Sequence, residues 1–125
     1  MADEPVRISA PDGAPPAGSY SPALVFGDLV FVSGQGPLDP EGAIIPGTIE
    51  EETERTLRNV EALLRAAGSG LDKVLKCTCY LADIADFDRF DAAYRRVFGE
   101  RLPTRTTVAA GLDGIKVEID AIAYR

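Results

Sequence analysis

Two neighbouring segments, Arg105-Thr-Thr-Val-Ala-Ala110 and Ile115-Lys-Val-Glu-Ile-Asp-Ala-Ile-Ala-Tyr124, decide the fold, and only Gly-Leu-Asp-Gly separates them. Side chains alternate across a strand, so the second segment has an unbroken apolar row on one face and its charged residues on the other. We predict that residues 111–114 close an antiparallel hairpin, with Arg105 opposite Asp120 and Thr107 opposite Glu118. One arginine and two carboxylates would then share a sheet face.

Upstream, two apolar runs within residues 24–33 surround Gly27-Asp28 and predict a β-hairpin, and residues 6–9 predict a short first strand. Residues 33–42 hold three glycines and two prolines, which predicts a loop that leaves the sheet. Residues 74–81 read as a further strand.

Two amphipathic helices are predicted between these strands. Thr48 and Glu51 form a capping box, and apolar residues then recur at spacings of three and four up to Gly68. A second helix is predicted from an N-cap at Asp86 to Gly99. Its buried stripe would consist of Phe87, Phe90, Tyr94 and Val97.

The element order ββαβαββ predicts an α+β fold in which two helices pack on one face of a mixed sheet. We expect residues 1–16 to be a flexible segment with the short strand, and residues 17–125 to be one domain. The other sheet face would carry both charges and apolar residues, which favours a subunit interface with a site between chains.

Composition excludes several classes of function. The net charge of −7 disfavours nucleic acid as a partner, and the absence of histidine removes Ser-His-Asp and Cys-His mechanisms. No segment predicts a membrane span or a secretory signal. Cys77 and Cys79 lie on one face of a strand, about 6.5–7 Å apart, which suits neither a disulfide nor a zinc site. We interpret both as packing residues in a reducing cytoplasm, with a redox role as the less favoured alternative.

Several fragments in order resemble the RidA family, formerly called YjgF, from about residue 17 to the C-terminus. The fragments are Gly18-Ser-Tyr-Ser21, Leu29-Val-Phe-Val-Ser-Gly-Gln35, Pro37-Leu-Asp-Pro40, Asn59-Val, Ala66-Ala-Gly-Ser69, residues 87–98, Pro103-Thr-Arg-Thr-Thr-Val108 and Val117-Glu-Ile-Asp-Ala-Ile-Ala123. The resemblance implies a chorismate-mutase-like fold and a homotrimer with clefts between subunits. Because the chain lacks histidine, a set of metal ligands and a nucleotide-binding motif, we expect no cofactor and no metal. It further implies hydrolysis of 2-imino and enamine acids, such as 2-iminobutanoate and 2-iminopropanoate, to 2-keto acids and ammonia.

The resemblance also implies roles for individual residues. Arg105 would grip the substrate carboxylate and Glu118 would position the attacking water, while other residues would line the cleft: Tyr20, Ser33, Gly34 and Gln35. We expect Asp91 and Thr107 to bind the substrate as well. The chain departs from the family at Thr107, where a cysteine is usual, at Asp91, where asparagine is frequent, and in its shorter last turn. These departures bear on substrate preference.

Alternative interpretations of the same residues remain open. Arg105 could be a structural cross-strand ion-pair partner of Asp120 or Glu118, and Glu118 could be no more than that partner. An arginine beside Glu118 would keep it ionised and a weak base. The protein could instead be a trimer that binds small carboxylates or a partner without turnover, or, less consistently with its acidic charge, a ribonuclease.

Overall fold

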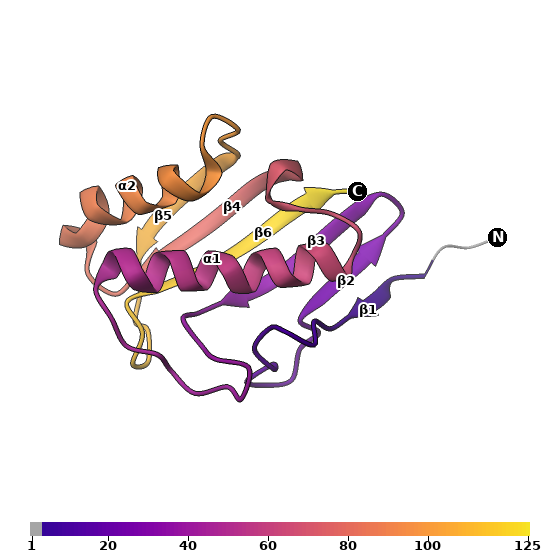
Figure 1. Ribbon diagram of the computed structural model, residues 1–125, viewed down its shortest axis with the longest axis horizontal. Helices are drawn as coiled ribbons and strands as arrows, with labels where there is room; N and C mark the ends of the chain where they lie inside the picture. Colours follow the sequence, from indigo (N-terminus) through magenta and orange to yellow (C-terminus); the bar gives the residue numbers. More distant parts are fainter. Residues whose placement is uncertain (1–3) are drawn as a thin grey trace.

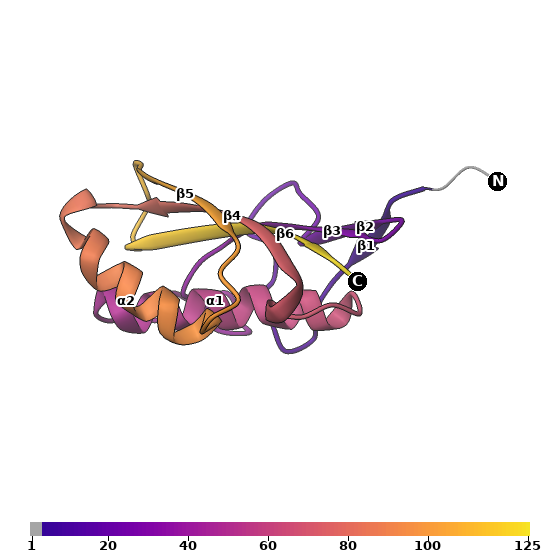
Figure 2. The same ribbon diagram turned by 90° about the horizontal axis from the view of Figure 1, so that it is seen from above.

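The computed structural model describes residues 4–125, which form a mixed six-stranded sheet with two helices on one face (Figures 1 and 2). The predicted α+β architecture is confirmed. The elements are β1 (Val6–Ile8), β2 (Ala23–Phe26), β3 (Leu29–Gln35), α1 (Ile49–Ala66), β4 (Val74–Leu81), α2 (Phe87–Phe98), β5 (Thr104–Ala109) and β6 (Val117–Tyr124), with short 3₁₀ turns η1 (Leu71–Lys73) and η2 (Ile84–Asp86). Residues 1–3 of the predicted N-terminal segment lie outside the described residues.

The sheet order is β1-β2-β3-β6-β4-β5, and among the strands of residues 4–125 only β4 and β5 pair in parallel. The predicted hairpin between β5 and β6 is therefore wrong, because β4 lies between these two strands. The burial pattern gives the physical reason. The inward row of β6 is almost completely buried and requires the centre of the sheet, whereas β5 is exposed or half-buried along its length and forms an edge.

The N-terminal hairpin is confirmed, with Phe26 paired to Leu29 across the two-residue turn at Gly27, whose φ is 60°. The predicted loop begins later than expected, because β3 continues to Gln35. This continuation contains a β-bulge: Val32 pairs with Ala121 and Gln35 with Ile119, so that two residues of β3 face one residue of β6.

Both helices begin where their sequences predict. Thr48 and Glu51 form the reciprocal capping box at the start of α1, through Glu51 N–H to Thr48 Oγ1 (3.2 Å) and Thr48 N–H to Glu51 Oε1 (2.9 Å). Asp86 occupies the N-cap position of α2 but makes no capping hydrogen bond. The side chain of Asp83 instead accepts from Ala85 N–H and caps η2, which leads directly into α2.

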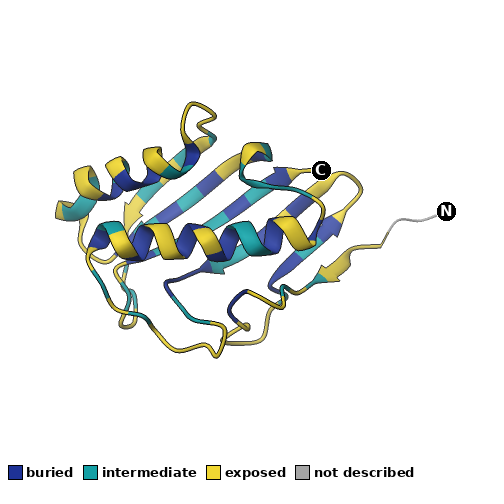
Figure 3. Cartoon of the chain, viewed as in Figure 1, coloured by how far each residue is buried: buried dark blue, intermediate teal, exposed yellow. Residues whose placement is uncertain are grey.

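The core lies between the helices and the inner face of the sheet (Figure 3). The predicted inward row of β6 is confirmed, since Val117, Ile119, Ala121 and Ala123 are buried. Cys77 and Cys79 are free and fully buried in this layer, as a packing role requires. Neither helix among residues 4–125 is long and apolar enough to cross a bilayer.

Candidate active site

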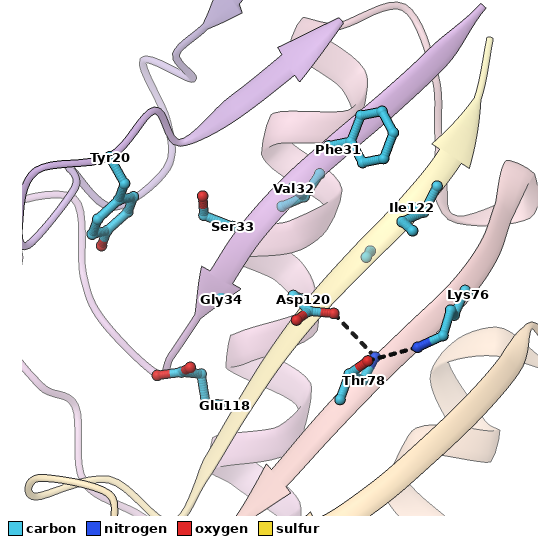
Figure 4. A pocket seen from close by; sticks show the side chains of 11 residues that line it. Tyr20, Phe31, Val32, Ser33, Gly34, Lys76, Thr78, Glu118, Asp120 and Ile122 are labelled. Atoms are coloured by element: carbon cyan, nitrogen blue, oxygen red, sulfur yellow. Dashed lines mark hydrogen bonds between the residues drawn. The ribbon is translucent and has the colours of Figure 1, made fainter.

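A hollow of about 530 Å³ opens on the sheet face that the helices leave uncovered (Figure 4). Its walls come from the loop before β2 and from β3, β6 and β4. The lining residues are Tyr20, Phe31, Val32, Ser33, Gly34, Lys76, Thr78, Glu118, Asp120, Ala121 and Ile122. Four residues that the sequence assigns to the site, Tyr20, Ser33, Gly34 and Glu118, are thus brought together.

Glu118 packs directly over Gly34 in the β3 bulge. A Cβ atom at position 34 would lie 2.6 Å from Glu118 Oε2, so the carboxylate occupies space that only glycine leaves free. Burial, and secondarily the neighbouring carboxylate of Asp120, raises the pKa of Glu118 above its ordinary value. The bulge therefore creates the place for a half-buried carboxylate that is more basic than a free glutamate.

The other residues predicted for this hollow have side chains that are bonded to the backbone. Ser33 Oγ donates to the carbonyl of Ser21 (2.7 Å), and Tyr20 Oη accepts from Ala17 N–H (2.9 Å), so both side chains are fixed by backbone groups. Gln35 pairs with Ile119 and is buried, and its amide donates to the carbonyl of Ser33 (3.0 Å). Gln35 thus supports the bulge and is absent from the hollow's lining, contrary to its predicted place in the cleft.

Lys76 and Thr78 of β4 also line the hollow, and sequence reasoning did not assign them to the site. Lys76 Nζ donates to Thr78 Oγ1 (2.7 Å), and Asp120 Oδ1 accepts from Thr78 N–H (3.1 Å), as the dashed lines in Figure 4 show. The signal was present in the sequence, since alternation places Lys76 and Thr78 on the face opposite Cys77 and Cys79.

Arg105 lies on the other face of the sheet. It pairs with Cys77 of β4 and points toward α2, where its Nη1 lies 2.8 Å from Asp91 Oδ1. Its guanidinium carbon is 4.7 Å from the ring centroid of Tyr94, and the rings of Phe90 and Phe87 follow at 5.4 and 5.5 Å. The guanidinium is thus held by an aromatic surface and one acidic partner.

A second hollow, of about 310 Å³, lies beside Arg105 at this edge and is also lined by Asp91, Tyr94 and Pro103. Thr107 follows two residues later on the same face of β5, and its buried Oγ1 has no hydrogen-bond partner within residues 4–125. The hydroxyls of Thr53, Thr56 and Tyr94 are likewise buried without a partner among the described residues, so this state is not particular to the Arg105 edge.

The thiols behind Arg105 are inert. Burial raises the pKa of Cys77 to about 11 and also raises the pKa of Cys79. Within the part of the chain that the structure describes, no group of three or more Asp, Glu, Cys or His side chains is arranged to hold a metal ion.

The predicted sharing of one face by Arg105, Glu118 and Asp120 is therefore wrong. Arg105 pairs in register with Cys77 on the covered side, whereas Asp120 pairs with Thr78 on the open side. The proposed structural ion pair of Arg105 with either carboxylate is wrong as well, because its partner is Asp91. Within residues 4–125 no arginine forms an ion pair with Glu118, and burial raises the pKa of its carboxyl.

Comparison with known proteins assigns the chain to a family. A family model described as Endoribonuclease L-PSP matches residues 11–125. A RutC family protein of Pyrococcus abyssi is 42% identical over 113 residues, which cover 88% of this chain and 89% of the relative. A 2-iminobutanoate/2-iminopropanoate deaminase of Rattus norvegicus is 39% identical and is matched over 95% of this chain and 90% of its own. The chain belongs to the RidA (YjgF) family.

Solved structures of the RidA family have the same fold. The YjgF gene product of E. coli superposes with a TM-score of 0.89 at 29% identity over 96% of this chain and 98% of that one. E. coli TdcF, solved with bound serine, gives a TM-score of 0.89 at 32% identity over the same two shares. The chorismate-mutase-like fold predicted from the RidA resemblance is thereby confirmed.

Proposed function

We propose that this RidA family member hydrolyses reactive 2-imino and enamine acids to 2-keto acids and ammonia in the cytoplasm, within clefts between the subunits of a homotrimer. The observation that carries the proposal is the presence of two complementary half-sites on opposite faces of one chain. One half holds a carboxylate of raised pKa, Glu118, in an open hollow. The other holds an arginine on an aromatic surface, beside a second hollow.

Assembly is needed because one chain cannot bring these halves together. The open face exposes Phe31, Val108 and Tyr124 beside the hollow's polar groups, a mixture that suits an interface between copies. Arg105 is on the edge strand β5, from which a guanidinium can reach a neighbouring molecule. In a closed ring every subunit would offer its β5 edge to the hollow of the next, which creates as many clefts as subunits.

Hydrolysis of an imine needs few catalytic groups. In its protonated form, a 2-imino acid has an electrophilic carbon, and Arg105 can hold the adjacent carboxylate through its planar pair of N–H groups. Glu118 accepts a proton from water as the water oxygen bonds to that carbon, which gives a carbinolamine. Glu118 then returns this proton to the nitrogen and accepts the proton of the carbinolamine hydroxyl as the C–O double bond forms and the C–N bond breaks. The products are the keto acid and ammonia, and ammonia takes the last proton, which leaves Glu118 ionised again. A carboxylate of raised pKa is a better base for the first step than an ordinary glutamate.

The names of relatives support this activity in part. The rat relative is named for the deaminase reaction, while the family model is described as an endoribonuclease. The net charge of −7 and the absence of histidine argue against binding and cleaving an RNA backbone. For this chain the deaminase reaction accounts for both half-sites, whereas a ribonuclease accounts for neither.

The test is release of ammonia when a dehydratase or amino-acid oxidase generates 2-iminobutanoate or 2-iminopropanoate in situ. The wild-type protein should accelerate release, and Arg105→Ala should abolish the acceleration. Arg96→Ala removes an exposed arginine of α2 and should leave the rate unchanged. Binding of small carboxylates without acceleration, by a protein shown to be folded and trimeric, would refute the enzyme and support a non-catalytic binding trimer.

A further inference from the structure

Arg105 already has a carboxylate partner within its own chain. Asp91 on α2 lies 2.8 Å from the guanidinium, and its side chain is 46% exposed, against 19% for Arg105. A ligand carboxylate that approaches Arg105 from solvent therefore meets the partner that is the more exposed of the two. Both Asp91 and Arg105 line the hollow at this edge.

We propose that Asp91 competes with the ligand carboxylate for Arg105 and thereby selects ligands by their negative charge. The inference rests on the proposed function, which assigns Arg105 to carboxylate binding. Ligands with one carboxylate and an uncharged side chain are accepted, and ligands with a second carboxylate are rejected.

The alternative role for Asp91 is to orient Arg105, and the geometry gives that role to other groups. Three rings surround the guanidinium carbon at 4.7 to 5.5 Å, and the backbone of β5 is fixed by its pairing with β4. These contacts do not depend on the charge of Asp91. Arg105 thus keeps its position when the charge of Asp91 is removed.

The cost that Asp91 imposes on a ligand is electrostatic. A carboxylate bound to the same guanidinium lies within a few ångströms of Asp91, and like charges at that separation repel even where solvent enters. An imino acid that carries its own positive nitrogen has little net charge and loses little affinity. A dicarboxylate brings a second negative charge into the same field and loses more, since nothing in the lining of this hollow except Arg95 offers another cation.

The inference is tested by equilibrium binding, which needs no turnover. Isothermal titration with 2-oxobutanoate and 2-oxoglutarate would compare the wild-type trimer with Asp91→Asn, an isosteric change that removes only the charge. We expect Asp91→Asn to bind 2-oxobutanoate about tenfold more tightly, and 2-oxoglutarate with a larger gain. Asp88→Asn removes the same charge from an exposed position of α2 and should leave both affinities within about twofold of wild type.

The outcomes separate this inference from the proposed function. Unchanged or weaker ligand binding by Asp91→Asn would overturn the charge-selection inference. An equal gain in affinity in Asp88→Asn would overturn it as well, because the effect would then come from the overall charge of the protein. If Arg105→Ala bound both ligands with wild-type affinity, Arg105 would not be the residue that binds the carboxylate, and both proposals would be refuted. Tighter binding by Asp91→Asn in a protein that releases no ammonia would support the charge selection and refute the deaminase.

Discussion

Arg105 and Glu118 project from opposite faces of one sheet. Arg105 pairs with Cys77, which faces the helices, whereas Glu118 pairs with Tyr80 on the open side. If both residues act on one substrate, they must come from different subunits.

Mixed assemblies should therefore regain activity that neither variant has alone. A preparation co-expressed from Arg105→Ala and Glu118→Gln subunits should show about a quarter of wild-type deaminase activity, because random mixing joins an intact arginine to an intact glutamate at about one cleft in four. Each variant alone should be inactive. A mixed preparation as inactive as its components would show that the two residues do not share a cleft.

Glu118→Gln should lower kcat by about 10² to 10⁴, the range typical for loss of a general base, with a smaller effect on KM. The wild-type rate should fall as the pH decreases through the raised pKa of Glu118, because the base must be ionised. A pH profile of kcat/KM checks both points. An unchanged acid limb in Glu118→Gln would assign that limb to another group.

The same substitution should stabilise the folded chain at neutral pH. A carboxylate whose pKa is higher folded than unfolded favours folding in its protonated form, so its contribution is full below the unfolded pKa and is lost as the pH rises through the folded pKa. Glu118→Gln should raise the free energy of unfolding at pH 7 by at most about 1 kcal/mol, since solvent screens the site. Urea titrations should show the difference disappearing near about pH 4.

Gly34→Ala should disturb catalysis more than folding. The new methyl group would lie 2.6 Å from Glu118 Oε2, and the carboxylate at the end of a flexible side chain would move away. Misplacement of a catalytic group by about 1 Å can lower the rate by about a hundredfold. Gly111→Ala is the matched control, because a Cβ there meets nothing within 4 Å. Equal kcat values for the two variants would argue against a catalytic role for the position of Glu118.

Glu52→Ala should destabilise the fold by about 3 kcal/mol. The Glu52 carboxylate is almost completely buried and accepts from the backbone N–H groups of Gly47 (3.2 Å) and Lys116 (2.9 Å) and from Lys116 Nζ (3.2 Å). It thus joins α1 to the loop before it and to the residues that lead into β6. Glu54→Ala removes an exposed carboxylate from the same helix and should change the free energy of unfolding by less than about 0.5 kcal/mol.

Local patterns predicted much of this molecule, because their signals are complete within a few residues. The capping box at Thr48 contains both of its partners, and alternation correctly placed Glu118 with Asp120 on one face of β6. Alternation also correctly placed Arg105 with Thr107 on one face of β5.

Alternation could not decide which row of β5 side chains lies on the same sheet face as the charged row of β6. The assumed hairpin put Arg105 on the same face as Asp120. In the structure β5 and β6 each pair with β4 instead, so the face on which each side chain lies is set by its own register with β4. A burial argument would have favoured this order, since the apolar row of β6 requires neighbours on both sides. The β3 bulge was also beyond the sequence pattern, because nothing local distinguishes the bulged Gly34 from a loop glycine.

The aromatic surface under Arg105 belongs to a longer series. Tyr94 lies 4.7 Å from Phe98 and 5.6 Å from Phe90, which in turn neighbours Phe87, so four rings run along α2 from the guanidinium to the end of the helix. These rings also fill the core. A substitution that repacks the interior along α2 should therefore also shift the Arg105 guanidinium, so the packing of the core and the position of this side chain are coupled.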